Sequence, residues 1–200
     1  MKPILFLLFT ALANPSFAYF SVMDTGHLTQ PEQYRVQGEG QFLMDAPKGF
    51  NFNGRFTTGL NEDSEIQGEV GIGTIDYYFG GFWKWVPIPD TDDQPAIGAR
   101  MGFTFASVND YSTYGFNITP LASKNLESDY GVFAPYLGIP IGLQKNSLDT
   151  NFTLQATLGV QWTPDQWKIP ELRGFHFLME YGFEIDDAFD YFSIGTAYDF

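Results

Sequence analysis

Alternation of apolar and polar side chains with a period of two is the feature that most restricts the fold of this chain. Residues 152–162, FTLQATLGVQW, place an apolar side chain at every second position. Residues 175–185, FHFLMEYGFEI, repeat the pattern with phenylalanine, methionine, tyrosine and isoleucine. Successive side chains of a β-strand point to opposite faces, so this pattern predicts strands that separate an apolar environment from a polar one.

Similar runs recur along the chain between clusters of Gly, Pro, Asn and Asp, and no stretch after residue 18 sustains a helical period. Because proline cannot donate to a sheet ladder, we expect Pro120, Pro135 and Pro140 at bulges or strand ends. The break between residues 74 and 77 has no strong turn signal, and without it the count falls to nine, which a bacterial single-chain barrel with both ends on one side does not allow. The number of strands is left between eight and ten. The ten runs cover residues 34–44, 50–60, 65–74, 77–86, 96–105, 112–120, 132–143, 152–162, 175–185 and 191–200. We predict an all-β fold, a closed antiparallel up-and-down β-barrel of about ten strands.

The first eighteen residues, MKPILFLLFTALANPSFA, have the three parts of a secretory signal peptide. Lys2 gives a positive start, residues 4–13 form a short apolar core, and small residues precede a cleavage site after Ala18. Ten apolar residues are too few to cross about 30 Å of hydrocarbon, which argues against a membrane anchor. We therefore expect residues 1–18 to be a cleaved signal peptide, residues 19–33 a periplasmic lead-in and residues 34–200 the barrel.

The alternation alone does not show which face of the barrel points inward. A soluble barrel of the lipocalin kind buries the apolar face around a ligand, whereas a membrane barrel turns it towards lipid. The polar face carries four bases and four acids, although the whole chain has 24 acidic and 10 basic residues. A balanced set suits an enclosed lumen, because unpaired charges away from water are costly. The predicted lumen charge network comprises Arg35, Glu39, Arg55, Glu69, Lys84, Arg100, Glu180 and Glu184, with His176 beside them.

Aromatic side chains mark the ends of the apolar face. Tryptophan and tyrosine concentrate where lipid head groups meet hydrocarbon. The residues concerned are Tyr34, Trp83, Trp85, Trp162, Tyr181, Tyr198 and Phe200. The surplus acids lie mostly in connections, such as NEDSE at 61–65 and DTDD at 90–93. Together these features favour a transmembrane barrel over a soluble one.

The signal peptide, the amphipathic strands and the terminal Phe200 with Tyr198 two residues before it resemble those of bacterial outer-membrane β-barrel proteins. The resemblance implies a location in the outer membrane of a Gram-negative bacterium. It also implies that Tyr198 and Phe200 belong to an insertion signal read by the barrel-assembly machinery. The expected partners are therefore that machinery and outer-membrane lipid. The formal charge of −14 makes nucleic acid a poor partner.

The connections depart from the usual pattern of this family. With the C-terminus on the periplasmic side, the longer connections, residues 87–95, 121–130 and 163–173, fall in the periplasm. Outer-membrane barrels usually have short periplasmic turns and long outer loops. Either one strand is miscounted or the outer loops of this barrel are short.

Catalysis is not expected from the sequence. No motif places a serine beside His176, and a nucleophile must lie within hydrogen-bond reach of its base. The chain has no cysteine, and the acidic residues after Asp90 lack the glycine and glutamate of a calcium loop, so we expect no cofactor or metal. Two main hypotheses remain, a filled barrel with a structural or loop-mediated interaction role and a narrow channel for ions or small solutes. A soluble ligand-binding barrel of the periplasm is a distant third.

Overall fold

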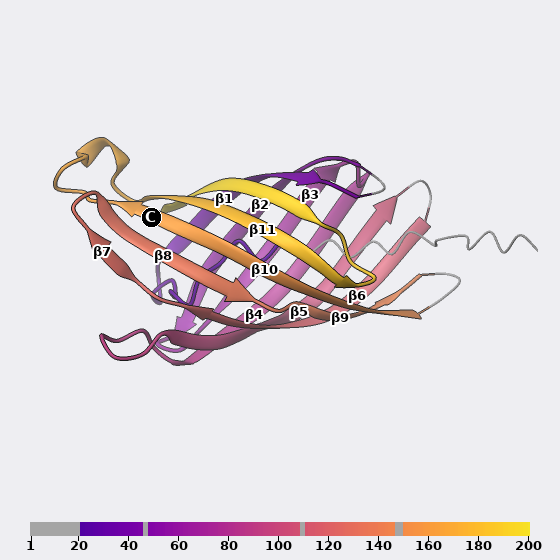
Figure 1. Ribbon diagram of the computed structural model, residues 1–200, viewed down its shortest axis with the longest axis horizontal. Coiled ribbons are helices and arrows are strands. Elements are labelled where there is room, and N and C mark those ends of the chain that lie inside the picture. Colours follow the sequence, from indigo (N-terminus) through magenta and orange to yellow (C-terminus); the bar gives the residue numbers. More distant parts are fainter. Residues whose placement is uncertain (1–20, 46–47, 109–110, 147–149) are drawn as a thin grey trace, which may run out of the picture.

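The computed structural model of the protein describes residues 21–45, 48–108, 111–146 and 150–200. These residues form one antiparallel sheet of twelve strands that closes on itself (Figure 1). The strands are β1 (Tyr34–Leu43), β2 (Gly49–Asn61), β3 (Ser64–Gly73), β4 (Tyr77–Ile88), β5 (Ala96–Val108), β6 (Tyr111–Ser123), β7 (Leu126–Ser128), β8 (Gly131–Gly138), β9 (Ile141–Lys145), β10 (Thr150–Pro164), β11 (Phe175–Asp186) and β12 (Tyr191–Asp199). A short 3₁₀ turn, η1 (Pro170–Leu172), precedes β11. In this part of the chain no helix is long and apolar enough to cross a membrane.

The last strand closes the barrel against the first. β1 and β12 pair from Arg35 opposite Asp199 to Leu43 opposite Tyr191. Tyr34 and Phe200 extend this pairing through two backbone hydrogen bonds of 2.9 Å. β8 and β9 both pair with β6 and β10, so they are two halves of one spanning strand, and β7 is a short strand beside β8. The barrel therefore has ten spanning strands.

All ten runs of alternation lie in spanning strands, which confirms the predicted fold class and resolves the strand number at ten. The prolines lie where a ladder is already interrupted. Pro140 separates β8 from β9, and Pro120 lies in β6 opposite that interruption. Pro135 lies inside β8 rather than at its end, next to Tyr136, where the pairing of β8 with β6 stops. Each proline thus lacks an N–H at a point where one neighbouring strand does not need it.

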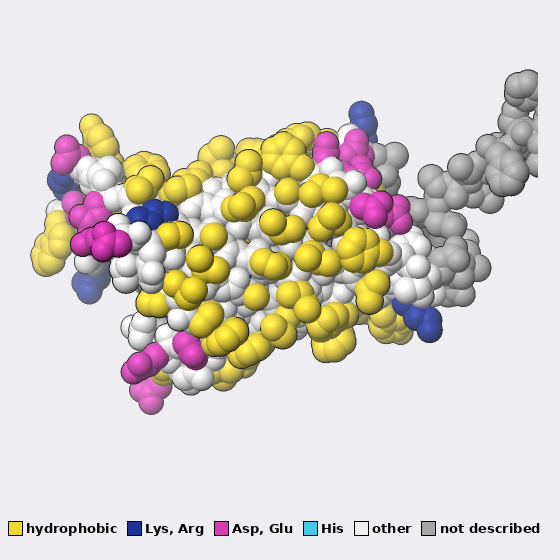
Figure 2. All heavy atoms as spheres, turned by 60° about the horizontal axis from the view of Figure 1, so that its bottom comes forward, with side chains coloured by type: hydrophobic (Ala, Val, Ile, Leu, Met, Phe, Trp, Pro, Cys, Tyr) yellow, Lys and Arg dark blue, Asp and Glu magenta, His cyan; other side chains and the backbone are white. Residues whose placement is uncertain are grey.

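The apolar face of the sheet points outward. Phe103 is 70% exposed and Ile72 is 62% exposed, whereas Lys84 is completely buried. Figure 2 shows hydrophobic side chains spread over the wall of the barrel, with the acidic side chains gathered at its two ends. Only a hydrocarbon environment covers such a wall favourably, so the arrangement is that of a membrane barrel and the reverse of a soluble one.

The longer connections all lie at one end of the barrel. Phe200 marks this end, which also holds the connections from β4 to β5, from β6 to β8 and from β10 to β11 (Figure 1). The strand count was therefore not the cause of the unusual loop pattern. If the C-terminus faces the periplasm, as the family resemblance implies, this barrel has short outer connections.

The segment before β1 does not lie outside the barrel as expected for a lead-in. Residues 21–29, which we call the lumen segment, are surrounded by inward-facing side chains of the strands. Residues 21–26 and Thr29 are buried. The assignment of residues 19–33 to a periplasmic lead-in is therefore wrong for this stretch, because its backbone finds its hydrogen-bond partners inside the barrel. The predicted signal peptide, residues 1–18, lies outside the described residues and stays a prediction.

Glycines on the inner face make room for two tyrosine rings. A Cβ added at Gly182 would lie 2.1 Å from Cε1 of Tyr191, and one added at Gly159 would lie 2.1 Å from Cζ of Tyr136. A Cβ at the outward-facing Gly81 would meet no atom within 4 Å. The inner glycines are thus needed for close packing in the lumen, as expected for a crowded interior.

We predict that Gly182→Ala lowers the free energy of unfolding by about 1–3 kcal/mol, because the new methyl group displaces a buried ring. The measurement is urea unfolding of the detergent-folded protein, followed by tryptophan fluorescence. Gly81→Ala, on the outer face of β4, is the control and should leave the midpoint unchanged. Equal midpoints for both variants would show that the lumen at Tyr191 is looser than described.

Candidate functional site

The inner face of the barrel holds eight of the nine residues predicted for the lumen charge network. The ninth, Glu184, is exposed near the end of β11, where its backbone N–H donates to Asp190 over 2.7 Å. Pairing of β11 with β12 ends at Gly182, so Glu184 projects beyond the closed part of the barrel. Its assignment to the network was wrong. The eight buried residues are Arg35, Glu39, Arg55, Glu69, Lys84, Arg100, His176 and Glu180.

Glu180 is the centre of one group of contacts. Its carboxylate accepts hydrogen bonds from the backbone N–H groups of Val22 (2.8 Å) and Met23 (2.5 Å). It also accepts the hydroxyl protons of Tyr136 (2.8 Å) and Tyr191 (2.5 Å). A carboxylate has about four acceptor positions, so all of them are used here. Two of the four donors belong to the lumen segment, which therefore completes the solvation of a buried charge.

The second group joins two arginines through one acid. Arg55 Nε lies 2.5 Å from Glu69 Oε1, and Arg100 also forms an ion pair with Glu69. The Arg100 guanidinium lies 3.6 Å from the centre of the Phe82 ring, a cation–π contact. Both arginines have donors left over, and these reach the lumen segment. Arg55 donates to the carbonyl oxygens of Val22 (2.9 Å) and Met23 (3.0 Å), and Arg100 donates to that of residue 21 (3.3 Å).

Lys84 forms the third group. Its ammonium lies 2.7 Å from Glu65 and 2.8 Å from Asp24 of the lumen segment. It also donates to the carbonyl oxygens of Thr25 (3.1 Å) and His27 (2.8 Å). The three protons of the ammonium are thus shared among four acceptor atoms. This buried charge is therefore satisfied from two sides, by the wall and by the lumen segment.

Further contacts hold the lumen segment along its length. Ser21 Oγ donates to Glu39 (2.8 Å), the Gly26 N–H donates to Ser123 Oγ (2.8 Å) and the Thr29 N–H donates to Glu65 (2.7 Å). Partners of the segment thus come from β1, β2, β3, β4, β5, β6, β8 and β11. The segment is bound from all around the barrel rather than lying against one wall.

A fourth group lies at the end of the barrel that holds the C-terminus. Arg35 binds both oxygens of Asp199, at 2.6 and 2.9 Å. His176 places Nε2 2.9 Å from Asp199 and Nδ1 2.8 Å from the hydroxyl of Thr163. These residues come from β1, β12, β11 and β10, which are consecutive around the barrel. They link four strands across the seam where the barrel closes.

The predicted network omitted three acids of these groups. Glu65 shares a strand face with Glu69 and begins the predicted run 65–74, but it was counted with the acids of the connection at 61–65. Asp199 lies between Tyr198 and Phe200 of the apolar face, so the alternation of residues 191–200 already places it on the inner face. Asp24 lies in the lumen segment, which has no periodicity. Including them restores a simple rule, that each buried base of the lumen meets at least one acid.

Comparison with known proteins finds similarity in the fold and none in the sequence. No family model matches the sequence, and no curated protein matches it. Solved structures with a similar fold include the β-domain of the Bordetella autotransporter BrkA, with 10% identity, a TM-score of 0.47 and coverage of 84% of this chain and 98% of that one. The outer-membrane protein OmpT of Vibrio cholerae has 11% identity, a TM-score of 0.34 and coverage of 84% and 98%. Ail of Yersinia pestis, the attachment invasion locus protein, has 14% identity, a TM-score of 0.31 and coverage of 84% and 96%.

We predict that Lys84→Met lowers the free energy of unfolding by about 3–5 kcal/mol, because Glu65 and Asp24 are then buried without their cation. Urea titration of the folded protein in detergent measures this loss. Lys145→Met, at an exposed position of β9, is the control and should leave stability nearly unchanged. A Lys84→Met protein as stable as the control would mean that these acids are not confined in the lumen.

Proposed function

We propose that this protein is an integral outer-membrane β-barrel whose lumen is filled, with a structural or loop-mediated interaction role. The observation that carries the proposal is the lumen segment itself, bound across the barrel by the charged groups of the wall. The cavity beside it, lined in part by Ser21, Glu39 and Arg55, has a volume of only about 10 Å³. That is room for about one water molecule. A cavity of this size admits no larger solute.

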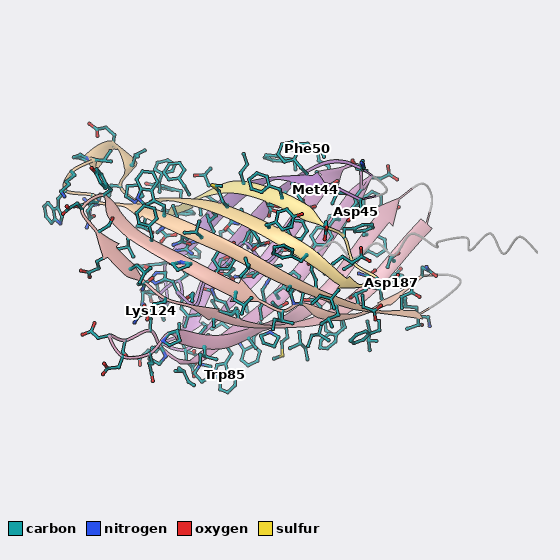
Figure 3. All side chains as sticks on the ribbon, viewed as in Figure 1. Met44, Asp45, Phe50, Trp85, Lys124 and Asp187 are labelled. Atoms are coloured by element: carbon teal, nitrogen blue, oxygen red, sulfur yellow. The ribbon has the colours of Figure 1, made fainter. Side chains whose placement is uncertain are left out.

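The longer connections support the interaction role, because they are joined to one another. Lys124, labelled in Figure 3, forms an ion pair of 3.0 Å with Asp90 of the β4–β5 connection. Lys168, after β10, donates to the backbone carbonyl of Asp129 in the β6–β8 connection. Three connections thereby form one continuous surface at the end that holds the C-terminus. We infer that this surface, on the periplasmic side, is where a partner binds.

The geometry at His176 favours a structural role over a catalytic one. The hydrogen bonds from Thr163 to His176 to Asp199 have the order of a nucleophile, base and acid. Arg35, however, already neutralises Asp199 by binding both of its oxygens. A carboxylate paired in this way stabilises a developing imidazolium charge less than a free one. We therefore assign these residues to the closure of the barrel.

The alternative function is a narrow channel for ions or small solutes. The same charged residues would then line a conducting path, and the lumen segment would narrow it rather than close it. Paired charges on the wall would give such a path little selectivity between anions and cations. The two functions differ in one measurable property, the current through a single inserted molecule.

We predict that the mature protein, folded in detergent and inserted into a planar lipid bilayer, passes no steady unit current. Arg100→Ala should produce openings, because it removes a contact with residue 21 and one partner of Glu69. Lys145→Ala, outside the lumen, is the control and should stay silent. Steady currents in the unaltered protein, with a selectivity that Arg100→Ala changes, would overturn the filled barrel and establish the channel.

A further inference from the structure

The contacts between the barrel wall and the lumen segment have the character of peptide recognition. The wall binds four backbone N–H groups of the segment, those of Val22, Met23, Gly26 and Thr29. It also binds five of its carbonyl oxygens, from residues 21, 22, 23, 25 and 27. Main-chain hydrogen bonds give a site affinity for an extended peptide without requiring particular side chains.

Two side chains of the segment supply the specificity. Asp24 binds Lys84 at 2.8 Å and Gln67 at 2.6 Å, and both of these partners are buried. Met23 packs in an apolar cluster with Leu178 and Ala197. A carboxylate next to an apolar residue is therefore what the wall distinguishes.

The conformation of the segment shows that the wall imposes its shape. Met23 has a φ of 40°, in the left-handed region that side chains other than glycine avoid at a cost of about 1–2 kcal/mol. Glu180 holds the N–H of this residue, while Arg55 and Gln37 hold its carbonyl oxygen. The peptide units on both sides of the strained residue are thus fixed by the barrel. A wall made of paired strands is the rigid partner, and the segment adapts to it.

The segment is attached to the barrel like a tethered ligand. Residues 30–33 join it to β1 through a turn in which the Gln33 N–H donates to the carbonyl of Gln30 over 3.1 Å. A short tether of this kind gives a ligand an effective concentration in the millimolar range. A separate peptide therefore competes only when the tethered one is weakened.

We propose that the lumen is a binding site for a peptide that carries a carboxylate, occupied in cis by residues 21–29 and open to a separate peptide of the same chemistry. The proposal rests on the filled lumen of the proposed function and adds that its filling is exchangeable. The partner it implies is an acidic, unfolded protein segment that reaches the end of the barrel at which β1 begins.

The test uses the full mature chain with Asp24→Asn, a change that removes the charge of the anchor and keeps its size. The probe is a fluorescein-labelled synthetic peptide of residues 21–29, SVMDTGHLT, and the readout is fluorescence anisotropy in detergent. We expect saturable binding to the Asp24→Asn chain. The same peptide with Asp24→Asn should bind at least about tenfold more weakly, because it lacks the partner of Lys84. The unaltered chain should also bind the native peptide less, since its own segment occupies the site.

Maleimide labelling of a cysteine in the lumen segment measures how accessible the segment is, independently of peptide binding. The chain has no cysteine, so Thr25→Cys introduces a single thiol at a buried position. We expect slow maleimide labelling of this thiol in the otherwise native chain and faster labelling beside Asp24→Asn. An unchanged labelling rate would overturn the role of Asp24 as anchor. Faster labelling without peptide binding, or equal binding of both peptides, would overturn the peptide site. A silent protein in the bilayer would in each case leave the filled barrel intact.

Discussion

Satisfaction of buried charge inside a closed barrel is the constraint on which the rest of this structure depends. Four cationic side chains, Arg35, Arg55, Lys84 and Arg100, are buried inside the barrel. The wall supplies acids for each of them, but leaves donors and acceptors unused. Backbone groups of an irregular segment are suited to fill this need, because they carry a donor and an acceptor at nearly every residue. The backbone of the lumen segment thus supplies the hydrogen bonds that water would otherwise give to the buried charges.

This view explains why buried ion pairs are tolerated here. Such pairs rarely add net stability, since removing two charges from water costs about as much as their attraction returns. In this barrel the ion pairs serve instead to hold the lumen segment in one position. The charges hold a strained backbone at Met23, and the two tyrosines on Glu180 depend on glycines of neighbouring strands for their space. The ion pairs, the strained backbone at Met23 and the packing of the two tyrosine rings therefore all involve the lumen segment or its direct partners.

Much of the fold could be predicted from the sequence, because alternation reports the two faces of a strand directly. The ten runs and the position of the long connections followed from it, whereas the outward direction of the apolar face followed from the balanced charges of the opposite face. The inward direction of Arg35, Lys84 and Glu180 followed as well. Glu184 was misplaced because alternation says nothing of where pairing with the next strand ends, and β11 extends beyond β12.

The lumen segment could not be predicted in the same way. Its residues show no period, and its main contacts are made by backbone atoms that every sequence possesses. The donors and acceptors that the wall leaves for the segment become apparent only when the strands are placed around a common axis. The sequence therefore predicts the strands of the barrel wall well and the position of the lumen segment poorly.

Hydrogen exchange of the backbone amides measures the central claim most directly. In the folded protein the N–H groups of Val22, Met23 and Thr29 should exchange as slowly as those of the strands, because buried carboxylates of Glu180 and Glu65 hold them. Glu32, on the exposed tether, provides the internal comparison. Exchange of residues 22, 23 and 29 at the rate of an unfolded peptide would show that the segment does not fill the lumen, and would contradict the account given above.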